Sequence, residues 1–503
     1  MYKISIQALA FLLCPIWGLS AGAQSTAGKT AGGKQDTSGA EALGWRLGVQ
    51  SYSFNQFTFF EAVDKSASMG MNVIEAYPGQ RISKDFEGDM EYKMDEATRK
   101  KVQEKLASAK IKLVNFGVVG ANSEGEWRAL FQFAKDMGIE TIVSEPAEKD
   151  ADFLEKLCDE FQINLAIHNH PKPSPYWNPD TVLKFVDGRS KRMGACADTG
   201  HWARSGLVPL ECVKKLKGRV ISSHLKDLNV ASEKGHDVPW GTGACNVAGV
   251  LAELKRQGYK GTFSAEYEYN WENSVPEITL CAQYFRLVAS ALADEGYKPL
   301  LKKDLSDAVM EKGGWGFENG VLTSKGKGDI WTKARYGDFA LDLEFKCAAE
   351  TNSGVFLRCA SIENWLHTSI EVQILQPWLE DQPRENCGGV FDCLGPTRKM
   401  IKPAGEWNHY LIIAKANRIY VVFNGEQVLN MDLDQWTEAH KNPDGTPNKF
   451  RTAYKDMPRA GHVGFQDYGN PVWYRSIRIQ RLSKQAAAGS ITRAAVKRLH
   501  RAR

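Results

Sequence analysis

The chain has 503 residues, of which 43% are hydrophobic and 25% are charged. These proportions are those of a soluble globular protein, and the length exceeds one ordinary core, so we expect two domains. The 64 basic and 60 acidic residues leave a net charge of +4, which is too small to demand an anionic polymer as a partner. We therefore expect no nucleic-acid partner.

The first 44 residues predict an export signal followed by a linker. Lys3 precedes an apolar stretch over residues 4–19, and small residues at 21–23 are typical of a cleavage site, so residues 1–23 are interpreted as a signal peptide. An uncleaved anchor is the alternative, but the apolar run is short and is interrupted by proline and glycine. Residues 24–44 are small and polar and predict a flexible linker. We expect the mature chain in a periplasm or outside the cell, without stable insertion in a membrane.

Between residues 45 and 297, a short apolar run is followed eight times by an amphipathic helical pattern. The first couplet comprises residues 45–54 and 59–70, and the last comprises residues 262–268 and 275–296. Eight strand–helix couplets in about 250 residues predict a (β/α)8 TIM barrel, an α/β fold.

Four side chains that bind metals stand at the ends of four of these apolar runs: Glu145, Asp198, His224 and Glu266. In a TIM barrel the carboxyl ends of the strands converge on one pocket, and period-two alternation places small or β-branched residues below these side chains. Three carboxylates and one imidazole favour one divalent metal ion (Mn, Mg, Co or Zn) and would repel one another without a cation. The alternative is that each acid caps a helix or pairs with a nearby lysine.

Other polar residues are candidates for the same pocket. His168 and His170 share a face at the end of the fifth strand, where one of them is a candidate general base; the alternative is hydrogen bonding within a loop. Glu75, Gln50 and Tyr52 follow the first two strands and are weaker candidates for a wall that contacts the substrate. They fit equally well as ordinary polar residues of a barrel.

The barrel resembles the sugar isomerase/epimerase superfamily, which includes xylose isomerases. The motifs are E on the fourth strand, D-x-x-H on the sixth, H-x-K on the seventh and E on the eighth, and the matching residues are Glu145, Asp198, His201, His224, Lys226 and Glu266. The resemblance implies that the four residues at the strand ends hold the metal and that Glu145 and Glu266 exchange protons with a substrate carbon. It also implies that His201 and Lys226 bind substrate oxygens. The HNH segment at 168–170 looks like the fifth-strand signature of related proteins.

After residue 298 the pattern changes to short alternating strands between turns, which predicts an all-β sandwich of the jelly-roll type over residues 298–482. Asn424-Gly425 predicts a tight hairpin. Ten cysteines are present, and Cys387 and Cys393 either form a bridge within one loop or stay free. Residues 483–503 are basic and rich in alanine, and are interpreted as a loosely ordered tail or as a contact with an anionic surface.

The second region resembles a family called 3-keto-disaccharide hydrolase, which has a concanavalin-like fold. The segments WGFENGVLTSKG, NSGVFLR, IEVQIL and GFQDYGNPVWYRSIRIQRL occur in the right order, but Tyr468 stands where the family usually has a histidine, which weakens the case for independent catalysis. Glu371 and Gln373 alternate with apolar residues and share one face, where Arg358 and Asp467 are candidates to join them. Four tryptophans are candidate platforms for sugar rings or ordinary core aromatics: Trp315, Trp365, Trp378 and Trp473.

The two resemblances together point to a small carbohydrate or glycoside substrate. A 3-keto-glycoside has an acidic proton at carbon 2, so its abstraction leads to β-elimination of the aglycone from carbon 1 while a metal holds the oxygens. The leading hypothesis is a metal-dependent 3-keto-glycoside lyase or hydrolase. The alternatives are a keto-sugar isomerase or epimerase whose sandwich binds carbohydrate, and a non-catalytic glycan-binding protein.

Overall fold

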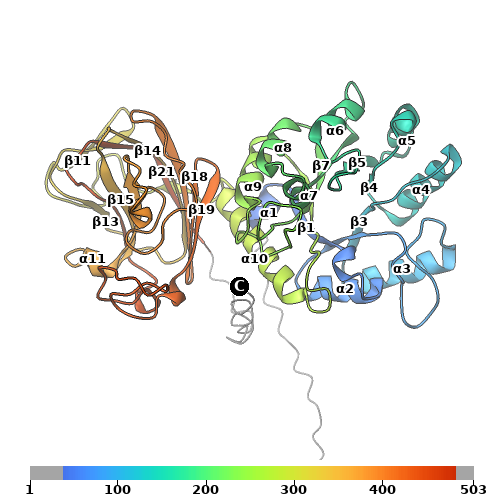
Figure 1. The fold of residues 1–503 in the computed structure, drawn as a ribbon, viewed down its shortest axis with the longest axis horizontal. Coiled ribbons are helices and arrows are strands. Elements are labelled where there is room, and N and C mark those ends of the chain that lie inside the picture. The colour runs from blue at the N-terminus through green and yellow to red at the C-terminus, as the bar shows by residue number, and fades with distance from the viewer. Residues whose placement is uncertain (1–37, 483–503) are drawn as a thin grey trace, which may run out of the picture. The chain divides into compact units, whose positions relative to one another are not determined.

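The computed structural model describes residues 38–482 (Figure 1). The predicted signal peptide, most of the predicted linker and the predicted basic tail lie outside these residues. Ser38–Ala42 forms a short helix, α1, where the sequence predicts a flexible linker. Ala40 is buried, so the end of this segment already belongs to the core of the barrel. No helix between residues 38 and 482 has the length and apolar character needed to cross a membrane.

Residues 45–292 fold as the predicted (β/α)8 barrel. The eight strands are parallel and closed, since β1 pairs with both β2 and β8. The strands are β1 Trp45–Gln50, β2 Val73–Ala76, β3 Lys112–Phe116, β4 Thr141–Ser144, β5 Asn164–His168, β6 Met193–Asp198, β7 Val220–Leu225 and β8 Gly261–Ala265. The helices that surround them are α2 Phe59–Ser68, α3 Glu96–Ala109, α4 Glu124–Met137, α5 Ala151–Phe161, α6 Pro179–Val186, α7 Thr199–Arg204, α8 Pro209–Lys215, α9 Val247–Arg256 and α10 Val275–Leu292 (Figure 1).

Alternation along the strands separates the outside of the barrel from its interior. Leu165 and Ile167 on β5 belong to the large core between the strands and the helices. Val143, Ala166 and Cys196 form a separate small cluster. Because side chains two positions apart share a face, the residues that follow this cluster by two positions point toward the mouth of the barrel. The packed interior therefore ends in a polar layer.

Residues 298–481 form two antiparallel sheets. The first has the order β10-β13-β20-β15-β16, and the second has the order β11-β12-β21-β14-β17-β18-β19, with β9 paired to β21. The strands are β9 Lys298–Pro299, β10 Ala308–Val309, β11 Trp315–Glu318, β12 Val321–Ser324, β13 Ile330–Thr332, β14 Phe339–Cys347, β15 Asn352–Cys359, β16 Ile370–Leu375, β17 Trp407–Lys415, β18 Arg418–Phe423, β19 Glu426–Asp432, β20 His462–Phe465 and β21 Val472–Arg481; a short helix, α11, spans Trp365–Thr368.

Two of the tight turns of this region are formed by Asn-Gly pairs. Asn424 and Gly425 both have positive φ, 51° and 87°, and join β18 to β19 as the sequence predicts. Asn319 and Gly320 make the equivalent turn between β11 and β12, with φ of 51° and 80°. Turns of this kind require a positive φ at both central residues, which asparagine and glycine tolerate best. The second turn has the same Asn-Gly pair, which stands in the segment WGFENGV.

The cysteines of the described chain are all free. Each of the nine between residues 38 and 482 is buried and unbridged. The possible bridge between Cys387 and Cys393 is therefore not formed. The Sγ atom of Cys387 instead lies 3.1 Å from the hydroxyl oxygen of Tyr410 inside the sandwich core.

Candidate active site

The ends of the barrel strands bring imidazoles and carboxylates together at one point. His168 ends β5, Asp198 ends β6, His201 lies in α7 and Glu266 directly follows β8. Each of these four offers one ligand atom, and these atoms all lie within 4.8 Å of one another. Each side chain is almost fully buried. The polar layer is thus a compact cluster rather than a set of separate helix caps.

His224 on β7 is held in place from below by Glu75 on β2. The Glu75 Oε1 atom lies 2.8 Å from Nε2 of His224, and its two oxygens also accept hydrogen bonds from Gln50, Asn115 and Ser264. Because Nε2 of His224 faces Glu75, its Nδ1 atom faces Glu266, and the distance from Nδ1 to Oε2 of Glu266 is 3.1 Å. Glu75 and Gln50 are each 1% exposed, so they orient His224 from the barrel interior.

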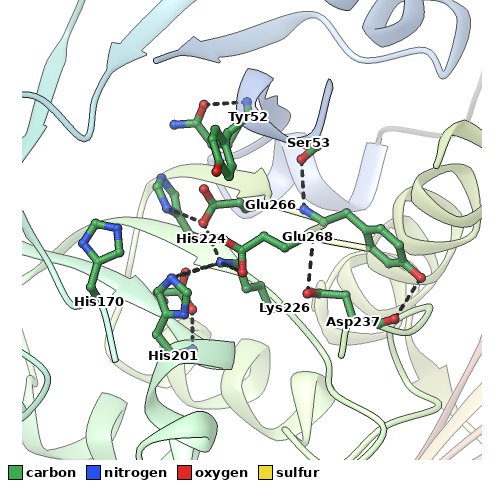
Figure 2. Close-up of polar contacts among 12 residues, drawn as sticks. Tyr52, Ser53, His170, His201, His224, Lys226, Asp237, Glu266 and Glu268 are labelled. Atoms are coloured by element: carbon green, nitrogen blue, oxygen red, sulfur yellow. Dashed lines mark hydrogen bonds and ion pairs between the residues drawn. The ribbon is translucent and has the colours of Figure 1, made fainter. Parts of the chain in front are cut away.

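Lys226 lies at the centre of the cluster. Its Nζ atom is 2.8 Å from Glu266 Oε2, 3.1 Å from Asp198 Oδ2 and 3.0 Å from Oε2 of Glu268 (Figure 2). Nζ also lies 3.2 Å from Nε2 of His201. The ammonium group therefore neutralises part of the negative charge gathered here.

Burial and these charges fix the protonation states. Burial alone would lower the pKa of Lys226, but the surrounding carboxylates raise it well above its usual value, so the side chain is an ammonium. Burial opposes ionisation of Asp198 and Glu266, yet the neighbouring cations and imidazoles hold both pKa values well below the usual range. Burial lowers the pKa of His201 well below its usual value, which leaves this ring neutral and able to donate a lone pair.

Glu145 forms a second group with the two histidines of the HNH segment. Its Oε1 atom lies 2.7 Å from Nδ1 of His170 and 3.3 Å from Nδ1 of His168, and its Oε2 accepts a hydrogen bond of 2.8 Å from Ser174. Burial would raise the pKa of Glu145, but the hydrogen bonds from these rings lower it strongly, so the carboxylate is ionised. The His170 side chain is 47% exposed and lies beside the cluster, with its ring centroid 5.4 Å from that of His201 (Figure 2). The structure therefore brings Asp198, His224 and Glu266 together and places Glu145 one step away, with His168 between the groups.

The cluster has the composition and geometry of a site for a divalent metal ion. Four of the buried polar atoms that make no hydrogen bond with any residue from 38 to 482 belong to this cluster: His168 Nε2, Asp198 Oδ2, His224 Nδ1 and Glu266 Oε2. The two oxygens are in ion pairs with Lys226. Two imidazole nitrogens and two carboxylate oxygens are a donor set that suits zinc, manganese or cobalt. This donor chemistry fits a divalent ion. Glu145 lies outside this set and contacts His168, whose Nδ1 is 3.3 Å from Glu145 Oε1.

The sequence analysis missed several residues at the rim of the barrel mouth. Glu268 follows Glu266 by two positions in EYEY, and this spacing already placed both on one face. Arg204 pairs with Glu268 and, at 3.0 Å, with Asp237. Tyr52 is 38% exposed and makes edge-to-face contacts with two aromatic residues absent from the predicted set, Tyr77 and Trp271. The mouth therefore has an aromatic side and a charged side.

Comparisons with known families divide the chain at the same place as its fold. Residues 63–282 match the model of the xylose isomerase-like TIM barrel, and residues 296–480 match the model of the 3-keto-alpha-glucoside-1,2-lyase-like domain. Each family model matches one region of the chain. The barrel family and the lyase-like family, together with the buried polar cluster, identify a carbohydrate-active enzyme of hydrolase, lyase or isomerase type.

Individual relatives cover parts of the chain. A 3-keto-disaccharide hydrolase of Bacteroides thetaiotaomicron is 24% identical over 211 residues, which is 35% of this chain and 71% of the relative. A Parabacteroides distasonis protein of known structure, described provisionally as a glycosyl hydrolase, is 36% identical over 37% of this chain and 99% of its own, with a TM-score of 0.36. The 3-keto-D-glucoside 4-epimerase of E. coli is 11% identical, covering 49% of this chain and 98% of its own, with a TM-score of 0.35.

Proposed function

We propose that the chain is an exported, metal-dependent enzyme that cleaves 3-keto-glycosides by removing the proton at carbon 2 and eliminating the aglycone from carbon 1. The observation that carries this proposal is the cluster of buried imidazoles and carboxylates at the mouth of the barrel. Ligand atoms of His168, Asp198, His201 and Glu266 all lie within 4.8 Å of one another, and Nδ1 of His224 lies 3.1 Å from Oε2 of Glu266. The second region supports the choice of substrate, because its family is described by 3-keto-alpha-glucoside-1,2-lyase activity and a relative is named a 3-keto-disaccharide hydrolase.

His168, Asp198, His224 and Glu266 would hold the metal ion. A divalent ion supplies a positive charge that stabilises negative charge developing on substrate oxygens. The protein supplies the rest: Lys226, with three buried ion pairs, keeps the carboxylates ionised, and Glu75 fixes the ring of His224. Tyr52, Tyr77 and Trp271 offer an apolar surface for the sugar ring at the rim.

His170 is the best placed general base. Its Nδ1 atom is fixed by the Glu145 carboxylate at 2.7 Å, which leaves Nε2 directed away from that contact. A carboxylate behind an imidazole sets the tautomer and stabilises the ring once it takes a proton. His168 is 1% exposed and lies between Glu145 and Asp198, so we assign it to the metal group rather than to proton transfer.

The proposed reaction balances without an oxidant or reductant. His170 removes the proton from carbon 2, the electron pair of that bond forms the double bond between carbons 1 and 2, and the bond from carbon 1 to the aglycone oxygen breaks. The proton held by His170 is then available to the departing aglycone oxygen. Addition of water across the new double bond gives the free 3-keto-sugar.

A keto-sugar isomerase or epimerase is the second candidate, because the barrel matches the xylose isomerase-like family. The same apparatus removes a proton beside a carbonyl in both reactions, and the fate of the resulting charge differs. Elimination releases an aglycone, whereas isomerisation conserves the mass of the substrate.

The test is to incubate the purified full chain with a 3-keto-glucoside and a divalent metal, and to follow products by mass spectrometry. We expect release of the aglycone, and a loss of at least about a hundredfold in rate for His170→Ala and Glu266→Gln. Two matched controls remove the same groups elsewhere: Glu160→Gln on the surface of α5 and His440→Ala in the sandwich. An unchanged rate in His170→Ala, or turnover without release of an aglycone, would contradict the proposal. N-terminal sequencing of the protein after expression with its leader tests the export.

A further inference from the structure

The second sheet of the sandwich shares a hydrophobic core with the barrel. Residues 38–482 belong to one compact unit. Four buried residues on β14, β17 and β18 belong to the same core cluster as the strands and helices of the barrel: Ala340, Leu411, Ile413 and Val422. Apolar burial is non-directional, so the precise placement of chain segments at this contact comes from its hydrogen bonds.

Two side-chain amides on β19 hold one carbonyl group of the barrel. Nε2 of Gln427 and Nδ2 of Asn430 donate hydrogen bonds of 2.7 and 2.8 Å to the carbonyl oxygen of Gly241. Oε1 of Gln427 accepts a hydrogen bond from the hydroxyl group of Tyr284 on α10. Because this hydroxyl group faces the oxygen of the amide, the nitrogen of the amide is directed to Gly241.

Gly241 lies in the segment 226–246, which joins β7 to α9. Its φ is 79°, a conformation that glycine adopts without steric cost. A Cβ atom at this position would lie 2.3 Å from the ring of Tyr284, so the close contact also requires glycine. The chain therefore passes the sandwich in a conformation that another residue would not keep.

The same segment is tied to the residue that follows Lys226. The carboxylate of Asp227 accepts three hydrogen bonds of 2.9 Å from the backbone N–H groups of Gly241, Gly243 and Cys245. Asp227 is fully buried. Gly241 is thus held through its N–H by Asp227 and through its carbonyl group by the sandwich. This leads directly from β19 to the position next to Lys226.

Asp237 in this segment also forms part of the mouth of the barrel. Its Oδ2 atom lies 3.0 Å from Arg204 and accepts a hydrogen bond of 3.3 Å from the backbone N–H of Glu268 (Figure 2). Arg204 pairs with Glu268, and Glu268 pairs with Lys226. The backbone N–H of Val238 donates to the carbonyl oxygen of Asp227 at 2.9 Å, which joins the two ends of the segment. The charged side of the mouth is therefore built on residues 226–246.

We propose that Gln427 and Asn430 of the sandwich are positioning residues for the barrel, which fix residues 226–246 through Gly241 and so hold Lys226 and Asp237 in place. The sandwich and the barrel then form one catalytic unit, and the sandwich acts on the reaction without contacting the substrate at the barrel mouth. The inference rests on the proposed function only for the reaction that serves as one of its two readouts.

The candidate site residues of the sandwich lie apart from this contact. Glu371 and Gln373 are on β16 of the five-stranded sheet, whereas β19 belongs to the other sheet. The guanidinium group of Arg358 donates to the carbonyl oxygens of Gly337 and Ala416. The candidate tryptophans have other partners: Trp315 is buried in the sandwich core, Trp365 contacts Phe356, Lys399 lies over Trp378, and Lys346 lies over Trp473. The positioning role is therefore independent of what binds the five-stranded sheet.

The first test measures hydrogen exchange of the full chain in peptides covering residues 226–246, which contain the three N–H groups bound to Asp227. We expect exchange to be about fivefold faster in Gln427→Met, and at least about tenfold faster when Asn430→Ala is added. Peptides from β15 and β16 should be unchanged, which shows that the variants are folded. Gln480→Met is the matched control, because Nε2 of Gln480 on β21 donates a bond of the same kind to the carbonyl oxygen of Glu295, away from the mouth.

The second test measures release of the aglycone from a 3-keto-glucoside with manganese. In the double variant we expect kcat to fall by at least about tenfold while KM stays within about threefold of the parent value, because the aromatic side of the mouth that receives the sugar is untouched. Gln480→Met should match the parent in both constants.

Unchanged exchange of residues 226–246 in the double variant would overturn the inference, as would faster exchange with an unchanged kcat. A parent chain that releases no aglycone would contradict the proposed function instead. In that case the exchange of residues 226–246 still decides whether the sandwich holds this segment.

Discussion

Replacing Glu371 by glutamine should change the pH dependence of stability in a predictable direction. Burial and Asp329 raise the pKa of this carboxyl group from 4.5 to about 8 in the folded chain. Each tenfold change in proton affinity corresponds to about 1.4 kcal/mol, so ionising Glu371 costs about 5 kcal/mol more in the folded than in the unfolded state. Glutamine never ionises and therefore never incurs this cost.

The sign follows from proton linkage. Below pH 4.5 the group is protonated in both states, and its full contribution to stability is present. Between pH 4.5 and 8 only the unfolded chain releases the proton, so stability is lost as the pH rises, and above about pH 8 the loss is complete. The free energy of unfolding of Glu371→Gln minus that of the parent chain should therefore rise by about 3 kcal/mol at pH 7 and about 5 kcal/mol at pH 9.

Hydrogen exchange along a guanidinium titration measures this quantity for the sheet itself. Peptides from β15 and β16 give the free energy of opening at pH 5, 6, 7, 8 and 9 without assuming that the two domains unfold together. Glu344→Gln is the control, because the pKa of Glu344 is lowered by its hydrogen bond with Arg475 and its removal should have the opposite dependence. A difference between Glu371→Gln and the parent that stays constant from pH 5 to 9 would refute the assignment of a neutral buried acid.

Two further predictions concern the barrel. Lys226→Met removes the ammonium group between Asp198 and Glu266, so without added metal the free energy of unfolding should fall by about 3–5 kcal/mol, measured as a lower melting temperature. Added manganese should restore part of the loss. No response to metal in thermal melts would count against the idea that a metal ion and the ammonium group occupy the same pocket. Glu75→Gln keeps the shape of the support under His224 but removes its charge, so metal affinity measured by calorimetry should fall about tenfold to a hundredfold while the fold, followed by circular dichroism, is retained.

The barrel and its polar mouth were predictable because they depend on local periodicity. Strands with period two, helices with period 3.6 and the closed topology of eight couplets together place the ends of β4 to β8 at one mouth, as the structure confirms. The hairpin at Asn424-Gly425 was predictable for the same reason, since its turn chemistry is contained in two residues.

The contacts within the mouth of the barrel join residues that are far apart in sequence, so no local sequence pattern predicts them. Glu75 and His224 are 149 positions apart, so nothing near either residue indicates that one orients the other. Lys226 belongs to the H-x-K motif that suggested a substrate contact, but its three ion pairs are with residues distant in sequence. The helix over residues 38–42 was missed because small polar residues predict a linker, whereas tertiary packing buries Ala40.

Chelation should separate the barrel from the sandwich, because their acid groups are held in opposite protonation states. In the barrel, cations keep Asp198 and Glu266 ionised, and within residues 38–482 the groups able to hold a metal lie only there. In the sandwich, desolvation keeps Glu371 neutral without a metal. Dialysis against a chelator should therefore abolish release of the aglycone and leave the free energy of opening of β15 and β16 at pH 7, measured by hydrogen exchange, unchanged. A fall in that free energy on chelation, with recovery on adding manganese, would mean that the sandwich depends on a metal and that desolvation alone does not keep Glu371 neutral.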